Sequence, residues 1–167
     1  VHDAYNLGLK DAPLVECLQA RIADIPIYLE NDANAATLAE LCAGALFCCA
    51  TGVLITLGTG VGGGLVLGGR LFRGGLGNGT ELGHMILDHT GTPCTCGNRG
   101  CLETLCSATW IEKQGRLAAK ADQDGMLSRV PHEIDAKAVF DCAKQGDPQA
   151  LGIVSRYVDQ LGSAIAS

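Results

Sequence analysis

The sequence has few basic side chains and no long hydrophobic run. Twelve Lys and Arg stand against eighteen Asp and Glu, and the net charge of −6 argues against a nucleic-acid-binding protein. No apolar run approaches the roughly 20 residues that a membrane-spanning helix needs, so we expect that the chain is not a membrane protein. What the chain does contain is 47% hydrophobic residues, enough for a sizeable core within its 167 residues.

Glycine and cysteine are abundant. The 23 glycines are about twice the average share and show no collagen period, which indicates positions with positive φ or close backbone contact. The nine cysteines are an odd number in a chain without a signal peptide, so we expect a cytoplasmic protein without a disulfide scaffold. The chain opens at Val1 and closes at Ser167 within an uncapped helical pattern, and we therefore expect a fragment.

The hydrophobic pattern changes between the helical and the strand period along the chain. It predicts helices over 14–22, from a cap at 31–34 to about residue 47, over 102–121, and over 135–166 with a break at Gly146-Asp147-Pro148. It predicts strands over 26–29, 52–57 and 64–67 and directly after Gly68-Gly69, and a polar loop over 122–133. The last three strands form a predicted β-meander with glycine corners.

A glycine-rich corner over 58–63 follows the strand 52–57. Gly58, Gly60 and Gly63 satisfy G-x-G-x-x-G, but a strand follows where a dinucleotide-binding turn requires a helix. The absence of G-K-[ST] excludes the phosphate loop of P-loop enzymes. Two interpretations remain open: a hairpin that only folds, or an anion-binding nest whose N–H groups and Thr59 hydroxyl face a phosphate.

One histidine and three cysteines lie within 18 residues of one another, namely His84, Cys94, Cys96 and Cys101. They are the ligand set of a closed structural zinc site, and the glycines at 97 and 100 permit the tight turns that such a site needs. We favour zinc over a packing role because the residues between the thiols are polar, and we interpret the other six cysteines as packing residues. A closed site has no open coordination position, so the chemistry must lie beside it.

Two carboxylates flank this motif. Glu81 precedes His84 by three residues and Glu103 follows Cys101 by two, so a folded metal loop would bring both near one point. Together with the imidazole they can hydrogen-bond several hydroxyls of one polyol, although each can also be a solvated surface charge. For Asp32, the residues alone favour a helix N-cap over a catalytic group.

Four segments together resemble the ROK family of bacterial sugar kinases and sugar-responsive repressors. They span 30–36, 57–64, 81–84 and 94–103, and the similarity continues through the helices to residue 167. The glucokinase-like branch is most similar, because its Cys-x-Cys-Gly-Asn-Arg-Gly-Cys-Leu-Glu run is intact. One departure is Gly79-Thr80 before Glu81, where the family usually has Ala-Gly.

The resemblance implies an α/β fold of the actin/hexokinase type, with two RNase H-like domains and the sugar between them, here incomplete at both ends. Residues 1–50 would end the small N-terminal domain, and 51–167 would form the large domain with its zinc-binding loop, incomplete at its C-terminus. The family's N-terminal phosphate loop and its adenosine-facing glycines fall outside these residues, so we expect weak ATP binding by this chain alone. A homodimer is the family's common assembly.

The resemblance also implies a cytoplasmic glucokinase of glycolysis that uses ATP and Mg²⁺ and holds a structural Zn²⁺. Asp32 would be the catalytic base that accepts the proton of the sugar's 6-hydroxyl. The sugar ligands would be Asn31, Asp32, Glu81, His84 and Glu103. The phosphate-facing residues would be Gly58, Thr59 and Gly60. The zinc ligands would be His84, Cys94, Cys96 and Cys101.

Two other hypotheses remain open. The first is the sugar-sensing domain of a ROK-type repressor without kinase activity, which would carry a DNA-binding helix-turn-helix ahead of Val1. The second is a zinc-stapled binding module that binds sugar without ATP. The residues do not distinguish a hexose such as glucose from an N-acetylhexosamine.

Overall fold

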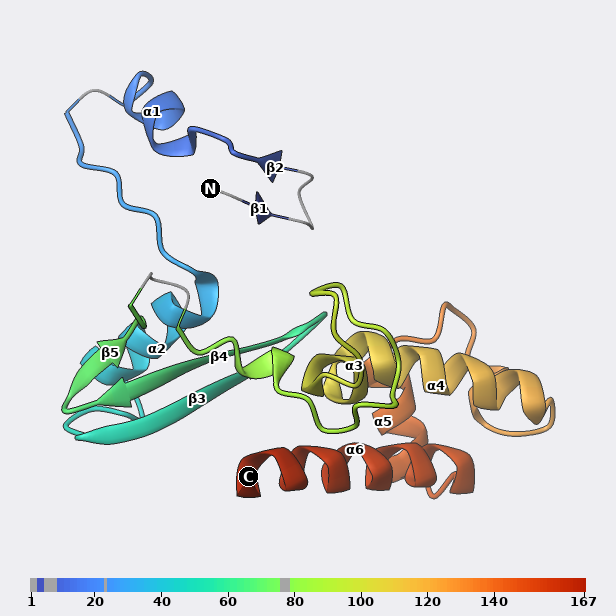
Figure 1. The fold of residues 1–167 in the computed structure, drawn as a ribbon. Coiled ribbons are helices and arrows are strands. Elements are labelled where there is room, and N and C mark those ends of the chain that lie inside the picture. Colours follow the sequence, from blue (N-terminus) through green and yellow to red (C-terminus); the bar gives the residue numbers. More distant parts are fainter. Residues whose placement is uncertain (1–2, 5–8, 23, 76–78) are drawn as a thin grey trace.

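The computed structural model describes residues 3–4, 9–22, 24–75 and 79–167, and these form a mixed α/β chain (Figure 1). The strands are β1 (Asp3–Ala4), β2 (Leu9–Lys10), β3 (Thr51–Leu57), β4 (Val61–Leu67) and β5 (Arg70–Phe72). The helices are α1 (Leu14–Gln19), α2 (Asp32–Ala43), α3 (Leu102–Cys106), α4 (Ala108–Ala121), α5 (Ala136–Lys144) and α6 (Pro148–Ala166), with 3-10 turns η2 (Leu82–His84) and η3 (Leu127–Arg129). β1 pairs with β2 in antiparallel orientation.

The sheet β3-β4-β5 is the predicted meander. Its strands are antiparallel and in sequence order, with Leu57 opposite Val61 at the glycine corner. The turn from β4 to β5 places Gly68 and Gly69 at φ of 58° and 71°, where side chains are strained and glycine is not. Helix α2 lies against β4 so closely that a Cβ on Gly64 would overlap the Thr37 side chain. The sheet and α2 thus form one layer pair.

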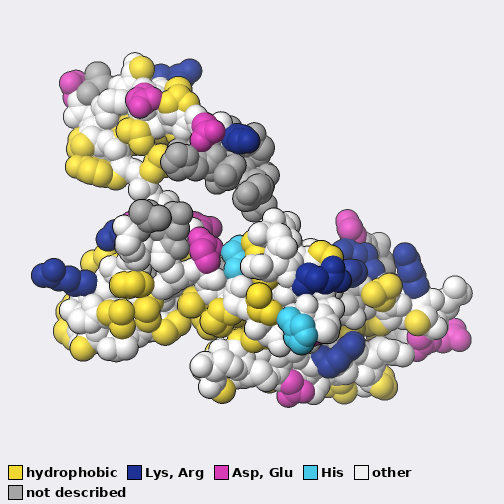
Figure 2. All heavy atoms as spheres, viewed as in Figure 1, with side chains coloured by type: hydrophobic (Ala, Val, Ile, Leu, Met, Phe, Trp, Pro, Cys, Tyr) yellow, Lys and Arg dark blue, Asp and Glu magenta, His cyan; other side chains and the backbone are white. Residues whose placement is uncertain are grey.

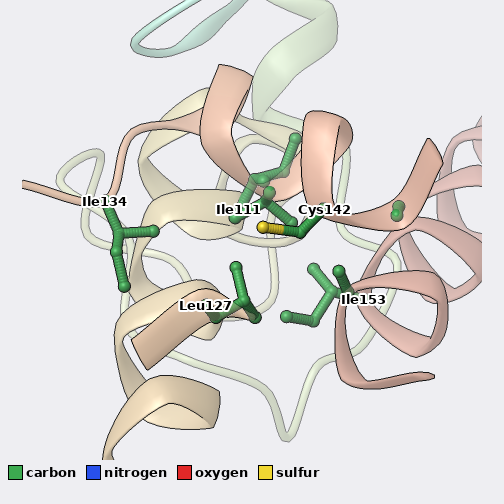
Figure 3. Close-up of a cluster of buried hydrophobic side chains, with 8 residues drawn as sticks. Ile111, Leu127, Ile134, Cys142 and Ile153 are labelled. Carbon is green, nitrogen blue, oxygen red and sulfur yellow. The ribbon is translucent and has the colours of Figure 1, made fainter. Parts of the chain in front are cut away.

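The C-terminal helices form a second body beside the sheet (Figure 1). Their core is the cluster drawn in Figure 3, composed of Ile111, Leu127, Ile134, Val139, Cys142, Ala143, Ala150 and Ile153. A smaller buried cluster joins this body to the sheet, because Val61 of β4 packs with Leu102 and Cys106 of α3 and with Ala164 of α6. This second cluster fixes α3, and with it the end of the metal loop, against the glycine corner.

Several predicted elements differ from the structure. Residues 26–29 are extended but pair with no strand of the described chain, and the Tyr28 side chain is 87% exposed. The helix expected to reach residue 47 ends at Ala43, because Gly44 leaves the helical region at ψ −150°. The single helix predicted over 102–121 is two helices, since Ser107 adopts φ −87° and ψ 161° and its side chain accepts from Trp110 N–H to cap α4.

The predicted loop 122–133 is mostly irregular but contains η3, whose Leu127 is 2% exposed and belongs to the helical core. The break at Gly146-Asp147-Pro148 is confirmed, with Asp147 capping α6 and Pro148 in its first turn. Of the six cysteines expected to be packing residues, Cys106 and Cys142 are buried, whereas Cys17, Cys42 and Cys48 are exposed and Cys49 is half-buried, so the packing interpretation is wrong for the exposed three.

Hydrophobic side chains remain exposed over the sheet. Figure 2 shows them gathered there, and they include Val53, Leu67 and Phe72, at 54%, 44% and 42% exposure. Within the described residues, no helix is both long and apolar enough to cross a membrane.

Asp147→Ala is expected to lower the free energy of unfolding by about 3 kcal/mol. Asp147 is 5% exposed, and its carboxylate accepts from the buried Ala150 N–H at 2.8 Å and from the partly buried Met126 N–H at 3.1 Å, so its loss leaves both donors without this partner. Urea unfolding measures the change. Asp135→Ala is the matched control, because this exposed cap accepts only from Ala138 N–H in α5 and should cost about 1 kcal/mol. Equal costs for the two variants would contradict the buried two-partner role.

Candidate active site

One cleft of about 1040 Å³ collects the predicted functional residues. Its walls are the start of α2, the corner between β3 and β4, the segment that enters η2, and the first turn of α3. Every predicted sugar-binding and phosphate-facing residue lines it: Asn31, Asp32, Gly58, Thr59, Gly60, Glu81, His84 and Glu103. Segments up to 72 positions apart in the sequence therefore meet at one hollow.

The first wall is the N-terminus of α2. Asn31 is the N-cap, and its side-chain oxygen accepts from Asn34 N–H at 3.0 Å. The interpretation of Asp32 as the N-cap is therefore wrong: Asp32 is the first helical residue, and its Oδ1 accepts from Ala33 N–H at 2.8 Å. Because Asn31 performs the capping, the exposed carboxylate of Asp32 is available to the cleft.

The glycine corner is held by the far side of the cleft. Gly58 N–H donates to Gly60 C=O at 3.0 Å, and Val61 N–H donates to Glu103 Oε2 at 3.1 Å. A Cβ on Gly60 would overlap the same carboxylate, so a side chain here would displace Glu103 from this position. In the proposed nest, the Val61 N–H group thus already donates to a carboxylate. The Thr109 hydroxyl donates to the Thr59 carbonyl at 2.8 Å.

The four predicted metal ligands converge beside the cleft. The ligand atoms of His84, Cys94, Cys96 and Cys101 all lie within 4.8 Å of one another, with 3.6 Å from Cys94 Sγ to His84 Nδ1 and 3.6 Å from Cys96 Sγ to Cys101 Sγ. Tetrahedral zinc with Zn–S of about 2.3 Å and Zn–N of about 2.0 Å requires ligand separations of about 3.6–3.8 Å. The donor set and its geometry fit zinc.

The turns of this loop depend on glycine, and the protonation of its thiols depends on burial and hydrogen bonding. Gly97 and Gly100 have φ of 92° and 63°, and a Cβ on Gly100 would overlap the Asp88 carbonyl. Burial raises the pKa of the Cys101 thiol to about 12, whereas a backbone N–H from Asn98 lowers the pKa of Cys96. A metal must therefore displace a proton from Cys101, so metal affinity falls as pH falls.

The residue before Glu81 is strained. Thr80 has a φ of 70°, a left-handed conformation that β-branched residues rarely adopt, and its hydroxyl has one long contact of 3.5 Å, to Gly63 C=O. The family resemblance implies glycine at this position, and glycine adopts such a φ without strain. Threonine at position 80 therefore introduces backbone strain directly before Glu81, which lines the cleft.

Thr80→Gly is expected to raise the free energy of unfolding by about 1 kcal/mol, because strain relief exceeds the extra entropy of glycine in the unfolded chain. Urea unfolding measures the difference. Thr80→Ala is the matched control, since it removes the same hydroxyl but keeps the strained Cβ. Equal effects of the two variants would show that φ is not the cause.

Comparison with known protein families matches residues 1–167 to the ROK family. The chain belongs to the ROK family. The glucokinase of Halalkalibacterium halodurans is 39% identical over 178 residues, which cover 100% of this chain and 52% of that protein. The glucokinase of Thermotoga maritima is 43% identical over 159 residues, covering 93% of this chain and 50% of that protein. The chain spans about half the length of the curated relatives it matches.

Solved structures of the family match the fold. A ROK family glucokinase from Streptomyces griseus in complex with glucose and AMPPNP has a TM-score of 0.86 and 32% identity, covering 99% of this chain and 55% of that chain. A ROK family transcriptional regulator, a homolog of the E. coli MLC protein, has a TM-score of 0.84 and 33% identity, covering 99% and 41%. The expected α/β fold of the actin/hexokinase type is confirmed.

Other cleft-lining residues received no role from the sequence. They include Glu30, Asn34, Thr56 and Thr80. Glu30 and Asn34 lie in the 30–36 segment that carries the family resemblance, but the resemblance did not predict their contacts. Thr56 gave no signal, because its place in the cleft depends on strand register, whereas Thr80 was noted only as a departure from the family pattern and its φ of 70° could not be predicted.

Proposed function

We propose that the protein carrying this chain is an ATP-dependent hexose kinase that phosphorylates the 6-hydroxyl, with glucose as the first substrate to test. The observation that carries this proposal is the single cleft that joins the Asp32 carboxylate, a wall of carboxylates and imidazole, and a glycine corner. The glucokinase relatives and the glucose-bound glucokinase structure support the same assignment.

The sugar would lie between two polar walls. Asn31 and Asp32 offer an amide and a carboxylate from α2, and Glu81, His84 and Glu103 offer two carboxylates and an imidazole from the other side. Carboxylates accept from hydroxyl groups, whereas the amide and the imidazole N–H donate to hydroxyl oxygens. A sugar ring presents both kinds of partner at each hydroxyl, so this mixture favours a polyol over an apolar ligand.

His84 would connect the metal loop to the sugar. Its Nδ1 faces Cys94, so metal binding at Nδ1 leaves Nε2 protonated in the neutral ring, and Nε2–H is then the donor available to a hydroxyl oxygen. Zinc bound by all four protein ligands supplies a structural link and no open coordination position. The metal would act by holding His84 and the preceding Glu81 in place.

Asp32 would act as the general base. It accepts the proton of the 6-hydroxyl while that oxygen forms a bond to the γ-phosphorus of ATP, and the bond from the γ-phosphorus to the bridging oxygen breaks to release ADP. The Mg²⁺ that accompanies ATP supplies charge neutralisation on the phosphate oxygens. Gly58, Thr59 and Gly60 would face those phosphates with a side-chain-free surface and the Thr59 hydroxyl.

The wider organisation is part of the proposal. Residues 1–50 would end a small domain and 51–167 would form most of a large one, with the sugar between them in a homodimeric cytoplasmic enzyme. A three-thiol zinc site requires reduced cysteines, which supports the cytoplasm. Under this division the small domain would line the cleft with Leu29–Asn34, and the large domain would line it with β3, β4 and η2.

A second candidate is the sugar-sensing domain of a ROK repressor. The matching transcriptional regulator, with a TM-score of 0.84, supports it. The two candidates differ ahead of Val1: a phosphate loop favours the kinase, and a DNA-binding helix-turn-helix favours the repressor.

The decisive test is a coupled assay of the complete protein that contains this chain. ATP, Mg²⁺ and a panel of hexoses and N-acetylhexosamines are supplied, and 6-phosphate formation is followed. Turnover on one sugar supports the kinase and names its substrate. Saturable sugar binding without turnover on any sugar would replace the kinase by the sensor.

A further inference from the structure

The Glu30 carboxylate joins two loops that are 43 residues apart. Its Oε2 accepts from Arg73 Nε at 2.6 Å, in an ion pair. Its Oε1 accepts from the backbone N–H of Asn31 and from Asn34 Nδ2, each at 3.1 Å. One oxygen thus faces the α2 loop and the other faces the residue that follows β5.

Each side of this bridge leads directly to a wall of the cleft. Glu30 immediately precedes Asn31 and Asp32, and its carboxylate accepts a hydrogen bond from the side chain of Asn34, which is 2% exposed. Arg73 follows β5, and Gly79 N–H donates to Arg73 C=O at 2.8 Å, next to Thr80 and Glu81. The bridge therefore connects the backbone of one sugar wall to the backbone of the other.

The charges on the bridge are compatible with a constant link. The Arg73 guanidinium is the main cause of the lowered pKa of Glu30, with the Asn34 and Asn31 donors adding to it. Glu30 therefore stays ionised at neutral pH, and arginine is always charged.

We infer that Glu30 and Arg73 are positioning residues, which hold the Asn31–Asp32 wall and the Glu81 wall at the separation that one sugar ring requires. This inference rests on the proposed function. In this role the two side chains would take no part in the reacting bonds and would act by fixing the two walls before the sugar arrives. Ordering a binding surface in advance lowers the free-energy cost of binding, so the effect should fall on sugar affinity.

A purely structural role predicts something different. The side chains of Arg73 and Glu30 are 49% and 29% exposed, and ion pairs this accessible contribute little to folding. Loss of the bridge should leave the melting temperature within error of the wild type. Sugar KM and thermal stability therefore separate the two roles.

The test uses Glu30→Gln, Arg73→Gln and their combination in the complete protein. We expect sugar KM to rise about tenfold in each single variant, with kcat within about threefold and the KM for ATP unchanged. The double variant should be no worse than either single variant, because all three lack the same link. Arg73→Lys should restore part of the affinity. Arg70→Gln is the matched control, since this exposed β5 arginine lies outside the cleft lining.

Two results would overturn the inference, and they differ. An active wild type whose Glu30 and Arg73 variants keep a normal sugar KM removes the positioning role and leaves the kinase intact. A wild type without turnover or sugar binding removes the proposed function, and the inference with it. Additive effects in the double variant, or a matching loss of melting temperature, would also overturn it.

Discussion

Asp32→Asn is expected to lower sugar phosphorylation by about a thousandfold while sugar affinity changes by less than about threefold. The amide has the shape of the carboxylate and keeps an oxygen for Ala33 N–H, but it cannot accept the proton of the 6-hydroxyl. The helix end should survive, because Asn31 provides the cap. The coupled assay measures turnover, and calorimetric titration with the sugar measures affinity.

Asp159→Asn on the exposed face of α6 is the matched control for this change and should be neutral in both measurements. Retained turnover in Asp32→Asn would remove Asp32 from the role of base. Loss of sugar affinity to the same extent as turnover would instead assign it to binding alone.

Cys96→Ser is expected to release the metal and to lower the free energy of unfolding by about 3 kcal/mol or more, because a structural site contributes its binding free energy to folding. Cys96 is exposed, so serine is tolerated sterically and the loss comes from the ligand. Metal content and urea unfolding measure the two effects. Sugar affinity should fall as well, since His84 is itself a ligand and Glu103 lies two residues beyond Cys101.

Cys42→Ser is the matched control, because Cys42 is exposed and lies outside the ligand cluster. It should change neither metal content nor stability. Unchanged metal content and unchanged unfolding in Cys96→Ser would defeat the zinc assignment.

The fold could be predicted where local signals agreed. The meander follows from β-rich runs and paired glycines, and the α5–α6 break follows from Gly146-Asp147-Pro148, because each signal acts within a few residues. The strand expected over 26–29 failed because a strand also needs a partner, which a local pattern cannot supply. The sequence did not predict the division of the helix at Ser107, because serine occurs within helices and also caps them.

The site could be predicted in the same uneven way. The metal cluster lies within 18 residues and its turns are marked by glycine, so the sequence alone places its ligands together. The proximity of Glu81 and Glu103 follows from their places beside the metal ligands, but the meeting of Asp32 with them required the family resemblance, since nothing in the spacing of Asp32 brings it to the same cleft. The Glu30–Arg73 bridge was missed entirely, because two common charged residues 43 positions apart carry no pattern.

The middle of β4 consists of glycine at 62, 63 and 64. Added side chains there would meet Ala33 and Thr37 of α2 on one face and Leu82 of η2 on the other, so α2 and η2 are separated at β4 by the thickness of one peptide backbone. A saturation library at these positions should return almost only glycine, although none of the three performs chemistry. Part of the glycine pattern that resembles a nucleotide-binding motif is therefore explained by the close packing of α2 and η2 on the two faces of β4.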